Sequence, residues 1–361
     1  MFTPATTARP VADVPEFSVS HWRYLHGPPV GHARVRACPE DFQVEEQLGF
    51  TPPGSGAHHW IYLRYHSLNT ADVARMIARA AGIPPKDVGY GGLKDRVALT
   101  SQWFSLPRQP ADSGIHEGIV SLSDRDERLE LLRVSANTRK LRRGVHSGNG
   151  FRITLRKVNA SGTALEARLK SIRARGVPNY FGPQRFGRNG NNLRAAVRMF
   201  RGESRRVDRM TRSMALSAAR AWVFNEVLSQ RIGRQSWDQP MAGDCMQLDG
   251  SRSRFIHDGS DPDVAGRVGQ GDIHLTGPLW GRGRTLATGP AAAFEEKAVA
   301  GIDVLPGGLA AAGLKQDRRA LRVFPAGLDW QCVEPDKMVL EFFLPQGAYA
   351  TAVLRELLHT G

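Results

Sequence analysis

Residues 59–82 read HWIYLRYHSLNTADVARMIARAAG, a segment in which a strand pattern passes directly into a helix pattern. The part up to Tyr65 is rich in aromatic and β-branched side chains, which favour an extended strand. Asn69 or Thr70 can cap a following helix, because the apolar side chains after them recur at the spacing of one helix face, and Gly82 is a typical stop. This segment therefore predicts a strand followed at once by a helix.

Several further strands are predicted on both sides of this segment. Alternating or β-rich runs cover residues 42–44, 102–106, 129–134, 151–155 and 338–344. Few helical patterns accompany them, among them an apolar stripe within residues 216–228 that ends at Gly233. Many strands with few helices are typical of an α+β fold, which is the class we expect.

The composition favours a folded protein that binds nucleic acid. Of the 361 residues, 41% are hydrophobic and 23% are charged, the usage of a soluble globular chain. The 49 basic residues, 41 of them arginine, exceed the 35 acidic residues and give a formal charge of +14. Residues 173–220 alone contain 12 arginines and two acids. Because arginine pairs with phosphates and stacks on bases, this excess favours a nucleic acid as the partner.

Other classes of protein lack their sequence signals. The three cysteines are far apart, which indicates reduced thiols, and no run approaches the roughly 20 apolar residues that cross a bilayer. The N-terminus has no apolar stretch typical of a signal peptide, so we expect a cytoplasmic protein with a loose segment at residues 1–20. Since the HExxH, Walker A and GxGxxG motifs are absent, we expect no metal and no nucleotide cofactor.

The densest polar turn is VGYGGLKDR at residues 88–96. Its glycines let the backbone approach a substrate closely. Lys94 and Arg96 flank Asp95 with positive charge, which we expect to keep this carboxylate ionised and able to act as a nucleophile. A turn whose charged side chains are merely solvated is the alternative that the local sequence leaves open.

A second motif begins with four cations within five residues: Arg139, Lys140, Arg142 and Arg143. Asn149 and Phe151 come shortly after, where a strand is predicted to begin. Cations that contact phosphates beside an aromatic platform for a base are typical of RNA-binding surfaces. The alternative is a solvated basic loop with Phe151 in the core.

Three pairs of adjacent residues could suggest a metal site: His58 with His59, Glu40 with Asp41, and Glu45 with Glu46. Adjacent residues of an extended segment point to opposite faces, so we expect the histidine pair to have no metal-binding role. The acidic pairs lack a further acidic cluster, and we expect them at a solvated strand edge.

Five motifs stand in a fixed order along the chain: RACPEDF at 36–42, GLKD at 92–95, GNGF at 148–151, VPNYFGPQRFG at 177–187 and FLPQGAYAT at 343–351. In residues and in order they resemble the TruD family of tRNA pseudouridine synthases. The resemblance spans about residues 22–358, and several motifs in register make it specific.

The resemblance implies a pseudouridine synthase-type catalytic domain with a central, mostly antiparallel sheet, built from residues 21–175 and 324–361. A TruD-specific α+β domain, residues 176–323, is inserted between them. The implied reaction is isomerisation of uridine 13 in the D-arm of tRNA to pseudouridine, with base flipping and without metal or organic cofactor. The implied partner is tRNA; no protein partner or membrane is implied, and we expect a monomer.

The resemblance also implies roles for single residues. Asp95 matches the nucleophilic aspartate. Arg36 stands where bacterial relatives have lysine, and Tyr349 where they have phenylalanine, so the charge and the ring are kept. We expect the substrate-binding residues to be Arg36, Phe42, Lys94, Asn149, Phe151 and Tyr349. The candidates for contacts with the tRNA backbone are Arg139, Lys140, Arg142, Arg143 and Arg185.

Two other functions use the same basic surface. One is an RNA-binding or RNA-remodelling protein without catalysis, which would give no reason for a carboxylate among cations that face a polyanion. The other is a metal-dependent ribonuclease, which would cleave the RNA strand and lose activity in EDTA. Asp95 is the residue that separates the first of these from an isomerase.

Overall fold

The structure, a computed structural model, describes residues 21–360 apart from 108–117, 119, 123–125 and 205, so the expected loose segment at residues 1–20 lies outside the described residues. The chain divides into two compact units. Of the described residues, the sheet unit comprises 25–179 and 323–360, and the inserted unit comprises 180–322 together with 21–24. The domain limits implied by the resemblance stay a prediction.

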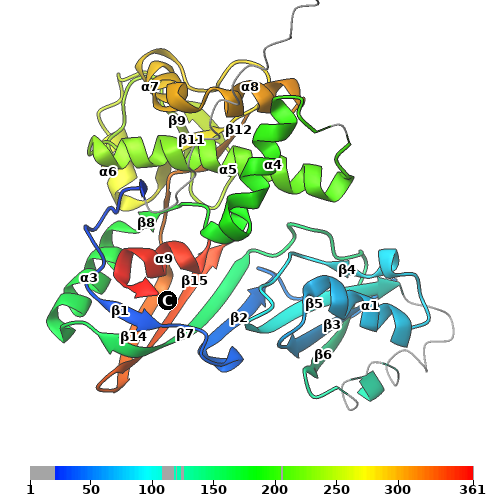
Figure 1. The fold of residues 1–361 in the computed structure, drawn as a ribbon. Helices are drawn as coiled ribbons and strands as arrows, with labels where there is room; N and C mark the ends of the chain where they lie inside the picture. The colour runs from blue at the N-terminus through cyan, green and yellow to red at the C-terminus, as the bar shows by residue number, and fades with distance from the viewer. Residues whose placement is uncertain (1–20, 108–117, 119, 123–125, 205, 361) are drawn as a thin grey trace, which may run out of the picture. The chain divides into compact units, whose positions relative to one another are not determined.

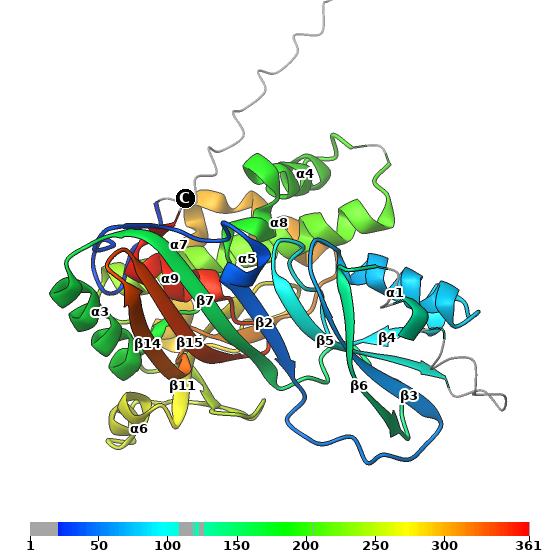
Figure 2. The same cartoon turned by 90° about the horizontal axis from the view of Figure 1, so that it is seen from below.

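The sheet unit is built on a ten-stranded sheet (Figures 1 and 2). The main strands, in order across the sheet, are β14 (Ala326–Glu334), β15 (Lys337–Pro345), β7 (Gly148–Asn159), β2 (Phe42–Gln47), β5 (Leu99–Pro107), β3 (His58–Tyr65) and β6 (Leu129–Asn137). The shorter strands are β1 (His32–Arg34), which pairs with β7 and β16 (His359–Thr360), and β4 (Gly89–Tyr90), which pairs with β5. Of these described pairs, β2 with β5 and β1 with β16 are parallel and the others antiparallel, which confirms the expected sheet.

Three of the described helices cover one face of this sheet. The helices are α1 (Thr70–Ala80), α3 (Gly162–Arg175) and α9 (Ala350–Leu357). α3 and α9 form an apolar core with β7 and β15, whereas α1 forms a second core with β3 and β5. Both cores lie on the same face, because Val44 of the first is aligned with Thr100, and Thr100 with Tyr65 of the second. β2 runs between the two halves of the sheet (Figure 2).

The strand and the helix predicted from residues 59–82 both form. α1 has Asn69 as its N-cap residue, and Gly82 follows its end with a left-handed φ of 64°. Val73 and Ile77 are fully buried on the face that packs on the sheet. The strands predicted elsewhere in the sheet unit also form, with one or more residues added at most of their ends.

The inserted unit is a second α+β assembly. Its sheet has the order β10 (Arg254–Ile256), β9 (Cys245–Leu248), β11 (Ile273–Leu279), β12 (Asp317–Ala320). Its helices are α4 (Asn191–Phe200), α5 (Arg209–Gly233), α6 (Val264–Gln270), α7 (Gly289–Val299) and α8 (Val304–Ala311). α5 is the helix predicted from the apolar stripe, and it packs on β11, α4, α7 and α8. Asp208 caps it by accepting hydrogen bonds from the amides of Met210 and Thr211 at 2.9 and 3.0 Å.

Two short strands lie where the chain passes from one unit to the other: β8 (Val177–Pro178) and β13 (Arg322–Val323). The three cysteines are free thiols, as the sequence indicates. Within the described part of the chain, no helix has the length and apolar character that a membrane span requires.

Candidate active site

A row of polar side chains crosses the helix-covered face of the large sheet. Asn149 of β7 is aligned with Glu46 of β2, and Gln102 of β5 donates a hydrogen bond from Nε2 to Glu46 Oε2 at 3.3 Å. Leu344 flanks the row on the β15 side and Leu63 on the β3 side. Glu46 and Gln102 are buried, and burial of such groups is unfavourable unless they are paired. The buried Glu46 carboxylate in this row therefore needs a cation beside it.

Lys94 supplies that cation. Its Nζ lies 2.8 Å from Glu46 Oε2 and 2.5 Å from Asn149 Oδ1, and its side chain is only 5% exposed. Burial lowers the pKa of Lys94, while the Glu46 carboxylate opposes the shift. The backbone amide of Lys94 donates to Thr70 Oγ1 at 2.9 Å, which attaches the polar turn to the start of α1.

Asp95, the next residue of this turn, has a half-exposed side chain that is held at both oxygens. Its Oδ1 accepts a hydrogen bond from the Val97 amide at 3.2 Å, and its Oδ2 lies 3.0 Å from Arg36 Nη2. The Arg36 guanidinium also lies over the ring of Phe42, with its central carbon 4.1 Å from the ring centroid. The site thus presents an accessible carboxylate, a cation and an aromatic ring together.

The prediction that Lys94 and Arg96 supply the positive charge at Asp95 is wrong. Lys94 was expected to flank the carboxylate, but its ammonium group pairs with the buried Glu46. Arg96 donates from Nε to the carbonyl oxygen of Ser67 at 3.2 Å. Successive side chains of an extended turn diverge, so the cation on Asp95 comes from Arg36, which is distant in sequence.

Asp41 shapes the loop that carries Arg36. Its Oδ2 accepts hydrogen bonds from the amides of Ala37 and Cys38 at 3.1 and 3.3 Å, and Arg156 Nε donates to it at 2.9 Å. Burial favours the neutral acid, but these hydrogen bonds outweigh it and hold the pKa of Asp41 below its usual value. Arg36 itself has a left-handed φ of 59°, which the anchored loop must maintain.

The aromatic residues of the site join it to the apolar core. Phe151 contacts Phe42 edge to face at 6.2 Å and stacks on Phe342 at 5.4 Å between ring centroids. Phe151 therefore has the core contacts that the sequence left open as an alternative. Tyr349 is the N-cap residue of α9 and is partly buried. It follows β15 at the end where Leu344 is aligned with Asn149.

The family model described as tRNA pseudouridine synthase D (TruD) matches residues 21–206 and 190–357. The chain belongs to the TruD family. It is 46% identical over 332 residues to a tRNA pseudouridine synthase D of Methylococcus capsulatus, with 92% of each chain covered. It is 44% identical over 338 residues to the protein of the same name from Nitrosococcus oceani, with 93% of each chain covered. The family resemblance of the sequence is therefore confirmed.

A solved structure described as a putative TruD protein, from Methanosarcina mazei, has the same fold. The TM-score is 0.67 at 21% identity, with 93% of this chain and 95% of the other covered. At this identity the likeness concerns the fold alone, and it agrees with the mixed α+β architecture expected for the TruD family.

Most of the expected TruD site residues lie in the sheet unit, where the contacts above connect them in two groups. Lys94 binds Asn149, and Arg36 with Phe42 adjoins both Asp95 and Phe151. Tyr349 is also in this unit. Arg185 belongs to the inserted unit, where its Nη1 donates to Ser217 Oγ at 3.0 Å.

The four cations Arg139, Lys140, Arg142 and Arg143 form a cationic cluster, which lies beside the turn that holds Asp95. Arg143 lies 5.6 Å from the ring centroid of Tyr90, and Lys140 Nζ donates to the carbonyl oxygen of Lys86 at 2.7 Å. The Gly144 amide donates to the carbonyl oxygen of Gly91 at 2.9 Å. The segment with these cations is therefore tied to the turn that carries Asp95.

Sequence reasoning missed two carboxylates of the site. Asp41 and Glu46 were expected at a solvated strand edge, and this is wrong, since both are at most 2% exposed. The signal was present in the alternation of β2, because Glu46 continues the face of Phe42 and Val44 at a period of two. What the pattern could not show is that Lys94 and Arg156 pair with these two acids.

His146 is a further residue of this region. Its ring lies against the turn that carries Asp95, since a Cβ at Gly91 would be 3.1 Å from Nδ1 and one at Gly92 would be 3.3 Å from Cε1. Burial lowers the pKa of His146, with Glu46 opposing the shift and Lys94 adding to it, which favours the neutral ring. The two glycines of the turn leave room for this ring.

Within the described ranges of the chain, no three His, Cys, Asp or Glu side chains are grouped as a metal ion would require.

Proposed function

We propose that this chain converts a uridine of tRNA to pseudouridine, with Asp95 as the nucleophile, and that uridine 13 in the D-arm is its target. The observation that carries the proposal is the half-exposed Asp95 carboxylate held 3.0 Å from Arg36, beside the buried group of Lys94, Glu46 and Asn149. Membership of the TruD family and the names of its relatives support the choice of reaction and of RNA.

The reaction needs a group that retains an intermediate while bonds are exchanged. The N-glycosidic bond breaks, the uracil turns, and C5 bonds to C1′; the C5 proton leaves and N1 takes up a proton. A carboxylate suits this task, because it can trap an electron-poor carbon of the ribose or of the base and leave again. Water must be excluded meanwhile, since hydrolysis of the intermediate would release free uracil.

The surrounding residues have roles that follow from their contacts. Arg36 holds Oδ2 of Asp95 and the Val97 amide holds Oδ1, so that the half-exposed carboxylate keeps one orientation. Asn149 Oδ1 is occupied by Lys94, which orients the amide nitrogen as a donor for a uracil carbonyl. A uridine within folded RNA must be flipped out to reach the carboxylate, at a cost of about a few kcal/mol that stacking and phosphate contacts offset.

The test is direct mapping of the product. Purified protein is incubated with an unmodified tRNA transcript, and pseudouridine is located by the primer-extension stop that a carbodiimide adduct causes. We expect one stop at position 13 of the D-arm. A stop at another uridine would leave the reaction in place and overturn the position, and the absence of any stop would overturn the reaction.

The same incubation separates the two rival functions. Activity that survives EDTA, with intact RNA on a denaturing gel, is the result expected for an isomerase. Strand scission that EDTA abolishes would indicate a metal-dependent ribonuclease. Tight binding of tRNA without any new pseudouridine would indicate an RNA-binding protein without catalysis.

A further inference from the structure

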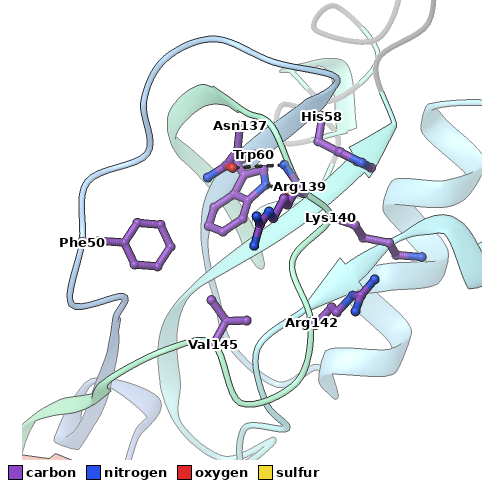
Figure 3. Close-up of a pocket in the computed structure, with 8 residues that line it drawn as sticks. All are labelled: Phe50, His58, Trp60, Asn137, Arg139, Lys140, Arg142 and Val145. Atoms are coloured by element: carbon purple, nitrogen blue, oxygen red, sulfur yellow. Dashed lines mark hydrogen bonds between the residues drawn. The ribbon is translucent and has the colours of Figure 1, made fainter.

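A pocket of about 720 Å³ opens on the sheet unit beside the cationic cluster (Figure 3). Its described lining residues are Phe50, His58, Trp60, Asn137, Arg139, Lys140, Arg142 and Val145. None of these eight is acidic, and three are Arg or Lys. The volume lies within the range of about 300–1,000 Å³ that is typical of small-molecule sites.

Phe50 and Trp60 give the pocket an aromatic wall. The ring of Phe50 stands edge-on to Trp60, with ring centroids 6.0 Å apart and an interplanar angle of 65°. Trp60 is buried, whereas Phe50 is 47% exposed. A large aromatic side chain that is half in water at the mouth of a pocket offers a free face on which a base can stack.

In the view of Figure 3, Lys140 and Arg142 lie on the side of the pocket away from Phe50, and Arg139 lies between, beside Trp60. The backbone of Arg139 is fixed twice, because its carbonyl oxygen accepts from Trp60 Nε1 at 2.9 Å and its amide donates to Asn137 Oδ1 at 3.2 Å. The guanidinium groups of Arg139 and Arg142 have no hydrogen-bond or ion-pair partner among the residues that the structure describes. Two such guanidinium groups suit a phosphate, because none of the described lining residues is acidic.

We infer that this pocket binds one unpaired nucleotide of the RNA substrate, distinct from the target uridine. Its base stacks on Phe50, and its phosphate contacts Arg139 and Arg142. The inference rests on the proposed function for the identity of the RNA. An acidic peptide would satisfy the cations but would leave the exposed face of Phe50 without a partner, so a nucleotide accounts for both features.

The position of the pocket agrees with binding of the same RNA molecule that reaches Asp95. The segment from Arg139 to Gly144 lines the pocket at one end and donates a hydrogen bond to Gly91 of the turn that carries Asp95 at the other. A nucleotide held here would thus anchor the RNA close to the turn that carries the nucleophile.

The test measures the affinity for unmodified tRNA over a salt series, with Asp95→Asn in every protein so that no turnover occurs. We expect Phe50→Ala to weaken binding about 5- to 150-fold with an unchanged salt slope, because stacking is not ionic. Phe50→Leu keeps the apolar contact with Trp60 and is expected to weaken binding as well, whereas Phe50→Tyr is expected to bind normally. Val333→Ala, which changes another half-exposed apolar side chain, is the control.

A second pair of variants tests the contacts of Arg139 and Arg142 with phosphate. Arg139→Ala with Arg142→Ala is expected to lower the log–log salt slope by about 0.7 for each lost phosphate contact. Lys157→Ala with Lys170→Ala removes the same charge from exposed positions outside the pocket. This control is expected to have a salt slope closer to that of the protein with Asp95→Asn alone. A blunt RNA duplex, which offers no unpaired base, is expected to bind equally well with and without the Phe50→Ala change.

Two results would overturn the inference. One is tRNA affinity of both Phe50→Ala and Phe50→Leu within about twofold of the Val333→Ala control, and the other is an equal loss for the blunt duplex, which would indicate backbone binding alone. Failure of the proposed function looks different. In that case tRNA would bind in a manner that depends on Phe50, but the protein with Asp95 intact would form no pseudouridine.

Discussion

Arg36 Nη2 lies 3.0 Å from Asp95 Oδ2, and the same guanidinium covers the ring of Phe42. One side chain therefore connects the proposed nucleophile with Phe42. The pair is partly exposed, at 28% for Arg36 and 46% for Asp95. Because water screens such a pair, its contribution to folding is small, and its value is in holding the carboxylate in one orientation.

Replacement of Arg36 is expected to affect the rate far more than the stability. Arg36→Ala removes a charged hydrogen bond to Asp95 and should lower kcat about 10- to 100-fold, which corresponds to roughly 1.5–3 kcal/mol. The free energy of unfolding should change by less than about 1 kcal/mol. Arg36→Lys should recover part of the rate, since it keeps the charge but not the planar fork. Single-turnover kinetics and urea unfolding measure the two quantities, and equal losses in both would contradict this role.

Disruption of the buried pair of Lys94 and Glu46 is expected to lower the stability of the fold strongly. Lys94→Met leaves the Glu46 carboxylate buried without its cation and should destabilise the fold by about 3–5 kcal/mol. Adding Glu46→Gln removes the orphaned charge and keeps an acceptor for the Trp103 amide, so it should recover much of that loss. Urea unfolding of the single and double variants provides the comparison. A double variant as unstable as Lys94→Met would show that charge burial is not the cause.

Tyr349 tests stacking against hydrogen bonding. If its ring serves as a platform for the flipped uracil or a neighbour, Tyr349→Phe should turn over tRNA almost normally, and Tyr349→Ala should lose roughly 1–3 kcal/mol of transition-state stabilisation. We expect this result, because phenylalanine keeps the face of the ring and removes only the hydroxyl group. Steady-state kinetics decide the question once circular dichroism shows that both variants are folded. Comparable losses for Phe and Ala would instead assign the role to the hydroxyl group, since a buried partner would be left unpaired.

Asp41 is expected to make the stability sensitive to acid. Its pKa is lowered in the folded state, so its contribution is complete above its unfolded pKa of about 3.9 and is lost as the pH falls through the lower folded value. Asp41→Asn should therefore reduce the loss of stability between about pH 5 and pH 3. Thermal unfolding across this range measures the effect, with Asp336→Asn, which changes an exposed acid, as the control. A profile unchanged from that of the control would contradict the role of Asp41.

Local patterns predicted the elements of this fold well. Strand β3 and helix α1 follow from periodicity and caps within a short segment, and α5 follows from its apolar stripe and Gly233. Each of these signals is carried by residues that are close in sequence. The family motifs then pointed to the region of Asp95, because they supply long-range information that periodicity lacks.

The pairing of charges within the site could not be predicted from the same patterns. Lys94 and Arg96 are next to Asp95 in sequence, yet Arg36 contacts it, because the loop before β2 brings Arg36 to the turn before β5. Glu46 reaches Lys94 only through the register of β2 with its neighbours. Such contacts depend on strand order across the sheet, which no local window contains.

The central claim is that Asp95 is the nucleophile, and the most direct measurement is pseudouridine formation by Asp95→Asn on unmodified tRNA, with tRNA affinity measured in parallel. The account predicts no carbodiimide-dependent stop above background and an affinity within about tenfold of the unchanged protein, since the substitution removes the nucleophile and slightly reduces repulsion of phosphate. Asp336→Asn, the control, should form pseudouridine normally. Substantial product from folded Asp95→Asn would contradict the claim.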